Sequence, residues 1–524
     1  MPPHLKFTED EKTKMDEYLA TKASFEEKRR ILQQQLEEVD LKIIETQADY
    51  GAIYNKRNPI FRLPVEVTCL IFTYAQLPRV IEKNDACEEE EEEVELLIEV
   101  IVSHVCRQWR SISLGLSKLW TCFHFEAGPI IAVPLERFDA YLERSAALPL
   151  RIWFDFKGDV NDSDNVKLVE KAVEHANRWQ HFTLYSSDGS VMGPFRQLQD
   201  QSAPMLEYLT LVPHVELNDE ELDDLVDEDF LKVMTSMDPQ IFRAGAPKLT
   251  YLMTDGYSMR YALPPLSNIT ILRIEKQQID SIQVFERLPF LELLSLSSLT
   301  QLSLSGDLIE PFGRPRSIHM PNLKRFRVSE FDTIWDLLPS LRAPKLDTLI
   351  IHICTFASGY LAGTSPASPD RGYSFPSLRK IYVIDSNVEF SVVPTFTQLT
   401  SQATDVLISH ESLLSSLMQR IVNGGYAGVV WPQLKKLSCN IAGVNEIDTY
   451  VAFAESRPKN SFEFRLHPMI FDQWDEGLEE LKEVSIVVLD EEWELDESFW
   501  PQDNGLGPNY DFGKDDYFAI SVHI

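Results

Sequence analysis

The sequence predicts a mixed fold, α+β or α/β, in which a helical N-terminal part precedes a solenoid with parallel strands. Residues 8–54 contain no proline and follow a helical seam. A short helical pattern begins at Leu63-Pro64, and a proline-led apolar pattern recurs from residue 204 onward. At 524 residues the chain exceeds one ordinary compact core, so we expect several modules or an elongated array.

Composition narrows the classes of partner. Hydrophobic residues make up 44% of the chain and aromatic residues 10%, which is typical of a folded protein. The formal net charge of −33 repels nucleic-acid phosphates and anionic membrane headgroups. We therefore expect neither nucleic acid nor membrane as a partner.

Cysteine usage and the N-terminus bear on location. The cysteines form no C-x-x-C pair and are too sparse for a disulfide framework, which favours reduced thiols. The start, MPPHLKFTEDEKTK, has no apolar signal region, and no run of about 18 apolar residues is present. A cytoplasmic or nuclear protein is the expectation.

The first segment, residues 1–57, is dominated by Glu, Lys, Gln and Leu. Apolar residues on an alternating spacing of three and four form a seam, interrupted by Lys22, Arg29 and Thr46. Its apolar members are Tyr18, Phe25, Leu32, Leu36, Val39, Ile43, Tyr50 and Ile53. Two interpretations remain open: a dimeric coiled coil, and a helix that folds back on its own chain.

The second segment, residues 58–125, reads as three short helices. Pro64 suits the first turn of a helix and Glu66 complements the positive helix end, while Pro78 ends the pattern. One apolar face consists of Leu63, Val67, Leu70, Ile71 and Tyr74, and a second stripe consists of Val94, Leu97, Ile98, Ile101 and Val105. The stretch CRQWRSISLGL predicts the third helix, before Leu119 and Trp120.

Three motifs in this segment occur in a recognisable order. They are Leu-Pro-x-Glu-Val-x-x-x-Ile-Phe at 63–72, Val-Cys-Arg-x-Trp-Arg at 105–110 and Leu-Trp at 119–120. Together they resemble the F-box, in the style of the large group of fungal F-box proteins. The resemblance covers about 65 residues. It implies three helices that dock on the small Skp-type adaptor of cullin–RING ubiquitin ligases.

One feature departs from that family. Its members join the first two helices by a short link, whereas residues 79–93 intervene here and carry the acidic run CEEEEEE. An insertion is tolerable because the entropic cost of loop closure grows only logarithmically with length. Its effect on adaptor binding is left open by the sequence.

The third segment, residues 130–524, carries a repeated pattern, Pro-x-Φ-x-x-Φ-x-Φ, where Φ is apolar. Its copies begin at Pro204, Pro264, Pro289, Pro321, Pro344, Pro376 and Pro432, with partial copies at Pro247 and Trp179. Such a pattern is a turn entering a short strand whose alternate side chains point inward. The irregular intervals are centred near the range of leucine-rich repeats.

Stacked units of this kind share a core, so we expect a leucine-rich-repeat-like arc with a parallel sheet on its concave side. The alternative is an α/β domain with unrelated prolines before its strands. Residues 216–229 and 355–374 break the rhythm and are expected to be loops. Stretches 462–468, 484–490 and 516–524 are expected to be strands of a C-terminal cap.

Catalytic and cofactor motifs are not found. There is no His-Glu-x-x-His, no phosphate-binding Gly-x-x-x-x-Gly-Lys-Ser/Thr loop and no Gly-x-Ser-x-Gly elbow. We expect no metal, no cofactor and no catalytic residue. A thiol enzyme using Cys106, beside Arg107, is a third hypothesis with no second feature behind it.

These observations predict a substrate-recognition subunit of a Skp-cullin-F-box (SCF) ubiquitin ligase. It would bind the adaptor, and through it the cullin, by its helices, and an unknown target protein by its repeats. The adaptor-binding residues expected from the resemblance are Leu63, Pro64, Val67, Ile71, Val105, Cys106 and Trp109. The alternative function is a non-catalytic scaffold of coiled coil and leucine-rich repeats without ligase association.

Overall fold

A computed structural model describes residues 7–55, 57–76, 97–126, 134–156, 162–186, 189–213, 234–275, 284–306, 308–309, 317–331, 334–356, 375–384, 386–388, 392–408, 430–439, 447–466 and 475–489. The chain divides into two compact units. The helical unit comprises residues 1–76 and 91–116, and the sheet unit comprises residues 77–90 and 117–524. The acidic insertion, residues 79–93, lies outside the described residues.

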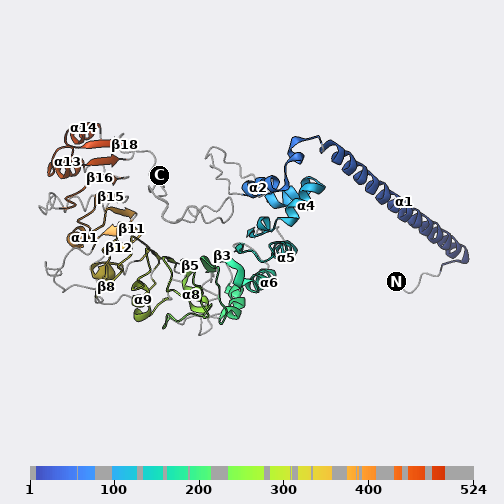
Figure 1. Ribbon diagram of the computed structural model, residues 1–524, viewed down its shortest axis with the longest axis horizontal. Coiled ribbons are helices and arrows are strands. Elements are labelled where there is room, and N and C mark those ends of the chain that lie inside the picture. Colours follow the sequence, from blue (N-terminus) through green and yellow to red (C-terminus); the bar gives the residue numbers. More distant parts are fainter. Residues whose placement is uncertain are drawn as a thin grey trace. The chain divides into compact units, whose positions relative to one another are not determined.

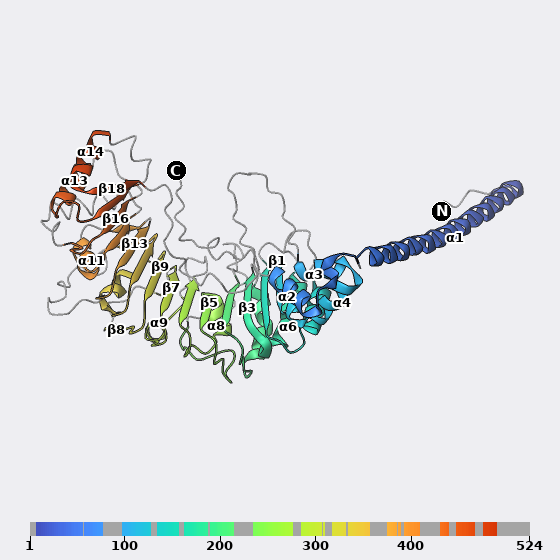
Figure 2. The ribbon, with the colours of Figure 1, turned by 45° about the horizontal axis from the view of Figure 1, so that its top comes forward.

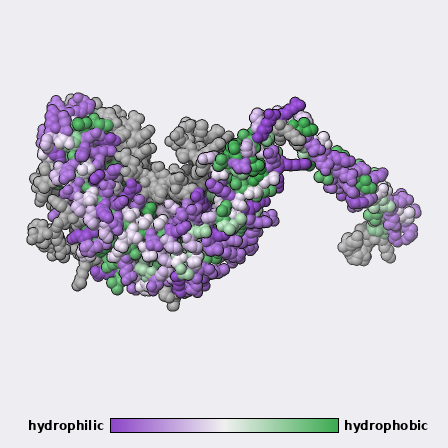
Figure 3. Space-filling view, viewed as in Figure 1, coloured by the Kyte–Doolittle hydropathy of each residue, from purple (hydrophilic) through white to green (hydrophobic). Residues whose placement is uncertain are grey.

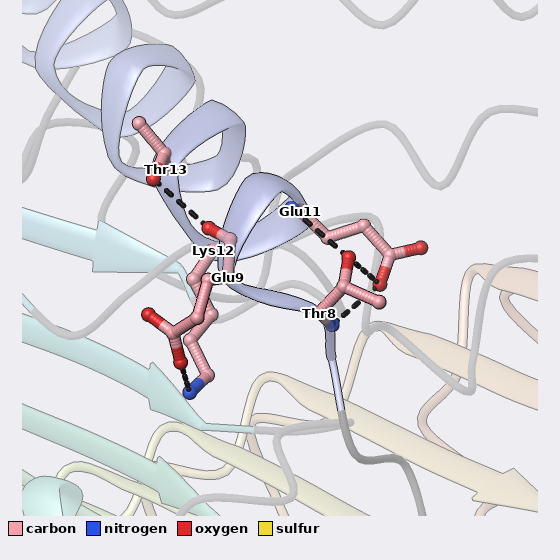
Figure 4. Close-up of polar contacts among 5 residues, drawn as sticks. All are labelled: Thr8, Glu9, Glu11, Lys12 and Thr13. Atoms are coloured by element: carbon pink, nitrogen blue, oxygen red, sulfur yellow. Dashed lines mark hydrogen bonds and ion pairs between the residues drawn. The ribbon is translucent and has the colours of Figure 1, made fainter.

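The helical unit begins with one long helix, α1 (Glu9–Asn55), of 47 residues (Figure 1). A capping box fixes its start. The Thr8 backbone N–H and hydroxyl donate to Glu11 Oε2 at 2.8 and 2.9 Å, and the Glu11 N–H donates back to Thr8 Oγ1 at 3.3 Å (Figure 4). The neighbouring Lys12 pairs with Glu9 at 2.7 Å.

The predicted seam of α1 is confirmed as one face of a helix, but it has no partner in the described chain. Its eight apolar side chains are all exposed, from 49% for Ile43 to 74% for Tyr18. The hypothesis that this helix folds back on its own chain is wrong, because α1 runs unbroken and no described residue of it is buried.

Four short elements follow in the described part of the helical unit: η1 (Pro59–Arg62), α2 (Val65–Ala75), α3 (Ile98–Val105) and α4 (Arg107–Gly115). The three predicted helices are therefore present. Pro64 stands one position earlier than predicted, as the residue that caps α2 rather than within its first turn. Gln76 caps the other end of α2, and Pro78 lies outside the described residues.

In the sheet unit, fourteen strands among the described residues form one sheet in which every pair is parallel (Figure 2). The strands are β1 (Cys122–Glu126), β2 (Leu150–Phe156), β3 (Trp179–Ser186), β4 (Tyr208–Pro213), β5 (Tyr251–Asp255), β6 (Ile271–Glu275), β7 (Gln301–Ser305), β9 (Arg325–Ser329), β11 (Thr348–His352), β13 (Lys380–Ile384), β15 (Asp405–Ile408), β16 (Lys436–Cys439), β17 (Glu463–Leu466) and β18 (Ile486–Leu489). Their spatial order follows their order in the chain.

Helices and turns connect these strands. They are η2 (Ser117–Trp120), α5 (Leu135–Arg144), α6 (Asp162–Val173), η3 (Ala176–Arg178), η4 (Gly189–Leu198), α8 (Gly256–Ala262), α9 (Arg287–Leu294), α10 (Ile334–Leu337), η5 (Leu338–Ser340), α11 (Val393–Leu399), α13 (Ile447–Glu455) and α14 (Asp475–Val484). Two minor pairs, β8 (Ile318–His319) with β10 (Leu341–Arg342) and β12 (Thr355–Phe356) with β14 (Asn387–Val388), are also parallel. The fold is thus mixed α/β.

The core of the sheet unit lies between the sheet and these connections. Alternate strand residues point into it, and they align from strand to strand because the register is parallel. Leu209 of β4, for example, pairs with Leu252 of β5, which pairs with Leu272 of β6, and each is fully buried. At the first strands, Phe138 of α5 packs on Phe123 of β1 with ring centroids 4.6 Å apart.

The Φ-x-x-Φ-x-Φ pattern predicts the strand register at most copies. Leu206, Leu209 and Leu211 are buried as expected, and the copies at Pro321, Pro344, Pro376 and Pro432 lead likewise into β9, β11, β13 and β16. The partial copy at Pro247 ends on Thr254, which is buried at the position where an apolar residue is usual. The partial copy at Trp179 coincides with β3.

Two copies of the pattern are assigned wrongly. The residues after Pro289 form helix α9, and the strand that follows uses Leu299, Leu302 and Leu304. After Pro264 the buried strand positions are Leu272 and Ile274, not Ile269 and Ile271. In both places a proline and leucines precede the true turn by one short segment.

Strands also occur where the pattern is silent. The sheet begins at β1, earlier than residue 130, and β15 follows Ala403 where other units have a larger apolar residue. The predicted strands near 462 and 484 are present as β17 and β18, and they continue the same sheet. The predicted strand at 516–524, nearly all of the loop at 355–374 and the acidic loop at 216–229 lie outside the described residues.

Candidate docking surface on the helical unit

Helix α2 has an inner and an outer side. Its inner side is short: Thr68 and Phe72, one turn apart, are the buried residues. Its outer side is apolar and exposed, with Val67 at 39%, Leu70 at 56%, Ile71 at 39% and Tyr74 at 69%. These four residues, at spacings of three and four, form one continuous face that we call the α2 docking face. Figure 3 shows hydrophobic residues gathered over this part of the helical unit.

Aromatic packing holds the inner side of α2. The Trp109 ring of α4 lies 5.0 Å from the Phe72 ring, edge-on, and 5.7 Å from the Phe61 ring of η1. Trp109 therefore joins three elements and is only half-exposed. Its ring contacts thus lie within the helical unit.

Cys106 acts as the helix cap of α4. Its backbone is extended, with φ −160° and ψ 167°, and its Sγ accepts a hydrogen bond from the Trp109 N–H at 3.4 Å. This bond satisfies a backbone donor at the start of the helix that has no partner within the helix. The structure thus gives Cys106 a local structural contact, and it does not bring the thiol together with a catalytic base through any described contact.

A polar contact joins α2 to α3. The side chain of Gln76 donates from Nε2 to Glu99 Oε2 at 3.4 Å, and Glu99 is buried. On the other side of α3, Ile101 and Val105 are exposed at 37% and 49%. The helical unit therefore presents apolar residues from both α2 and α3 to the surrounding solvent.

The seven expected residues fall into two groups. Pro64, Val67, Ile71 and Val105 are exposed, whereas Leu63, Cys106 and Trp109 are half-buried. Leu70 and Tyr74 were left out of the expected site, although they are among the most exposed apolar residues of α2. Their helical spacing from Val67 was the available signal, because i, i+3 and i+7 share a face.

The second face of the sheet is a separate candidate region. It carries a cluster of buried residues on strands from β2 to β15: Trp153, Tyr185, Val212, Tyr251, Met253, Ile350, Ile384 and Leu407. His124 of β1 stacks on Trp153 with centroids 3.9 Å apart. Arg273 and Arg327 occupy matching positions on β6 and β9 of this face, so it combines aromatic, aliphatic and basic groups.

Within the described residues, no three His, Cys, Asp or Glu side chains come together as a metal site would require. Nor does any helix described there combine the length and apolar character of a membrane span. Comparison of the chain with models of protein families, and with curated proteins, yields no match.

Proposed function

We propose that this chain is a substrate-recognition subunit of a Skp-cullin-F-box ubiquitin ligase. The α2 docking face would bind the Skp-type adaptor, and the adaptor would bind the cullin. The sheet unit would hold the target protein. The exposed, contiguous apolar face of α2 is the observation that carries the proposal.

An apolar helix face is costly to leave in water, and such faces mark sites where another protein binds. In α2 the arrangement is unusual, because the more apolar side faces outward while Thr68 faces inward. A stable contact buries about 800 Å² on each partner. The four α2 residues supply the centre of such a contact, and Pro64 and Val105 lie on flanking elements.

The F-box motifs lie on elements that suit this role. Leu63-Pro64 precedes α2, Val105-Cys106 joins α3 to α4, and Trp109 locks α4 against Phe72. The motif residues thus divide into two groups: those that hold the three helices together, and those whose side chains are exposed and could contact the adaptor. This supports the proposed adaptor binding and assigns the two groups different effects on mutation.

For the sheet unit we propose a degenerate leucine-rich-repeat solenoid. The support is that each strand pairs with the next along the chain and that Φ-x-x-Φ-x-Φ residues fill the core. The target would bind along the second face of the strands, where Tyr208 and Tyr382 are partly exposed. Aromatic residues are enriched at protein interfaces.

In this proposal the chain supplies no catalytic residue. Holding a target beside a ubiquitin-charged enzyme makes the transfer effectively intramolecular. Proximity of this kind lowers the activation free energy by several kcal/mol. The complex would form in the cytoplasm or the nucleus.

The test is co-purification of the full chain with a Skp-type adaptor, comparing Val67→Asp with Val65→Asp. Both residues are exposed valines of α2, but they lie about 200° apart around the helix. We expect Val67→Asp to weaken adaptor binding by about tenfold or more and Val65→Asp to leave it nearly unchanged. Equal effects of the two changes would remove the proposed face.

The alternative function is a scaffold without ligase association. The long exposed helix α1 favours it, because a scaffold needs an extended protein-binding element and the F-box does not. Wild-type chain that fails to bind any Skp-type adaptor, while the helical unit is folded, would decide for the scaffold.

A further inference from the structure

Helix α1 exposes a seam that no described residue of the chain covers. In heptad terms the first core position, a, is held by Met15, Lys22, Arg29, Leu36, Ile43 and Tyr50, and the fourth, d, by Tyr18, Phe25, Leu32, Val39, Thr46 and Ile53. Among the a and d positions from Leu32 to Ile53, Thr46 alone lacks a large apolar side chain or an aromatic ring. This part spans three heptads, the minimum for which a coiled coil is usually recognised.

We propose that two copies of this chain associate through α1 as a parallel, in-register coiled coil. The occupant of the seam is thus a second copy of the same helix. This inference extends beyond the proposed function, since each copy would keep its own adaptor-binding face and its own sheet unit.

The area available is adequate for a stable pair. The eight apolar seam residues are each 49–74% exposed. Large side chains exposed to this degree each contribute on the order of 100 Å², so the seam offers roughly 800 Å² per helix. This matches the area per partner of a standard specific interface.

The charges beside the seam select the orientation. Between residues 14 and 47, every charged residue at position g is a lysine: Lys14, Lys28 and Lys42. Every charged residue at position e over the same span is acidic: Glu26 and Asp40. In a parallel, in-register pair, the g row of one helix runs beside the e row of the other, so the basic row lies along the acidic row. Each g lysine faces the e residue five positions later, which is Leu19, Gln33 or Gln47, so like charges stay apart. In an antiparallel pair, g faces g and e faces e, which would place like charges together.

The polar seam positions favour two strands. A charged residue at a costs stability but restricts the number of helices, because it must reach water at the edge of the seam. Lys22 shows this geometry already, with its Nζ 3.7 Å from Glu26 Oε1 at the flanking e position. The pair Arg30–Glu27, at 2.7 Å, lies at b and f on the outer side and does not obstruct the seam.

The chain offers a matched pair of variants for the first test. Leu36→Asp/Ile43→Asp changes one leucine and one isoleucine at a positions, and Leu41→Asp/Ile44→Asp changes the same residue types at outward positions. Leu36 and Leu41 are equally exposed, at 61%. The two variants therefore share composition, charge and helix propensity, and they differ in position on the helix.

The measurement is the mass of the full chain in solution at about 10 μM by light scattering after size exclusion. One chain is 60.2 kDa, so we expect wild type and the outward variant at twice that mass and the seam variant at the single mass. Wild type at the single mass, an assembly larger than two, or equal effects of the two variants would each overturn the proposal.

Orientation is tested by Tyr50→Cys under mild oxidation, beside wild type and Leu41→Cys. In a parallel pair, residue 50 faces its own copy at the short Cα separation, about 4.4–6.8 Å, that a disulfide requires. In an antiparallel pair the two copies of residue 50 would be roughly 50 Å apart. A crosslinked dimer with Tyr50→Cys alone supports the parallel pair, and its absence in a dimeric sample would refute it.

Neither measurement involves the adaptor. A monomeric wild type would rule out the paired helices and leave adaptor binding intact, whereas a wild type that binds no Skp-type adaptor would rule out the proposed function and leave the mass of the chain unchanged. The two proposals can therefore fail separately.

Discussion

The Trp109 ring meets the Phe72 ring edge-on at 5.0 Å, and this contact fixes which side of α2 faces outward. Phe61 adds a second ring contact to the indole, at 5.7 Å. The α2 docking face is thus a consequence of aromatic packing behind it. Substitutions in this aromatic packing should therefore lower the stability of the helical unit, whereas substitutions in the α2 docking face should weaken adaptor binding.

Trp109→Ala should destabilise the helical unit rather than act on adaptor binding alone. Loss of two ring contacts at a half-buried site is expected to cost about 2–4 kcal/mol. Trp109→Phe keeps an aromatic ring and should lose less than half as much. Hydrogen exchange of the α2 and α4 amides measures the effect, and unchanged protection in Trp109→Ala would show that the indole does not hold the helices.

Replacement of Cys106 should follow its role as a helix cap. Cys106→Ser retains a hydrogen-bond acceptor and should leave the α4 amides as protected as in wild type, or more so. Cys106→Val removes the acceptor and should cost about 1 kcal/mol. The same hydrogen-exchange measurement applies, and a thiol-enzyme role would instead require Cys106→Ser to abolish an activity without affecting α4.

The start of α1 should respond to acid. The backbone N–H of Thr8, and then its hydroxyl, lower the pKa of Glu11. Because the folded-state pKa lies below the unfolded value, the carboxylate stabilises the helix start above the unfolded pKa, and this contribution is lost as pH falls through the lowered one. Exchange of the first-turn amides, corrected for intrinsic rates, should rise between about pH 5 and pH 3.

Two variants test that assignment. Glu11→Gln should remove the pH dependence of exchange at the first turn, whereas Glu17→Gln, which removes a carboxylate elsewhere on α1, should preserve it. If both variants retain the wild-type profile, another group controls the helix start.

Thiol labelling should separate the buried from the accessible cysteines. Burial raises the pKa of the Cys439 thiol and keeps its sulfur from solvent, since Cys439 is in the core of the sheet unit. Cys69, Cys106 and Cys122 are half-buried. With iodoacetamide on native protein, mass spectrometry should find these three alkylated well before Cys439. Rapid native labelling of Cys439 would mean that the end of the sheet opens readily.

The sequence predicts the helices and most strands here because local patterns suffice for both. A leucine-leucine spacing of three and then two residues indicates a turn followed by a strand, and Leu206, Leu209 and Leu211 follow it. The spacing after Pro289 looks similar, yet it belongs to α9, because three-residue spacing is also the period of one helical turn. Local spacing alone cannot distinguish those two cases.

The candidate surface was predicted in part for a related reason. Val67, Ile71 and Phe72 are all strongly apolar, so hydropathy does not tell which of them faces inward. The answer depends on Trp109, which is more than thirty residues away in the chain. The same limit applies to α1. An apolar seam in the sequence indicates that another surface covers it, but the sequence does not tell which molecule provides that surface.

The agreement between chain order and strand order in the sheet has a consequence for robustness. Each strand depends directly on two neighbours, so an extra segment between two strands lengthens one connection and leaves the remaining pairs as they were. Destabilisation is local for the same reason: a cavity beneath one strand weakens the packing of that strand and of its two neighbours first. Heating should then melt the sheet unit in stages, from its weakest strands outward, rather than in one cooperative step.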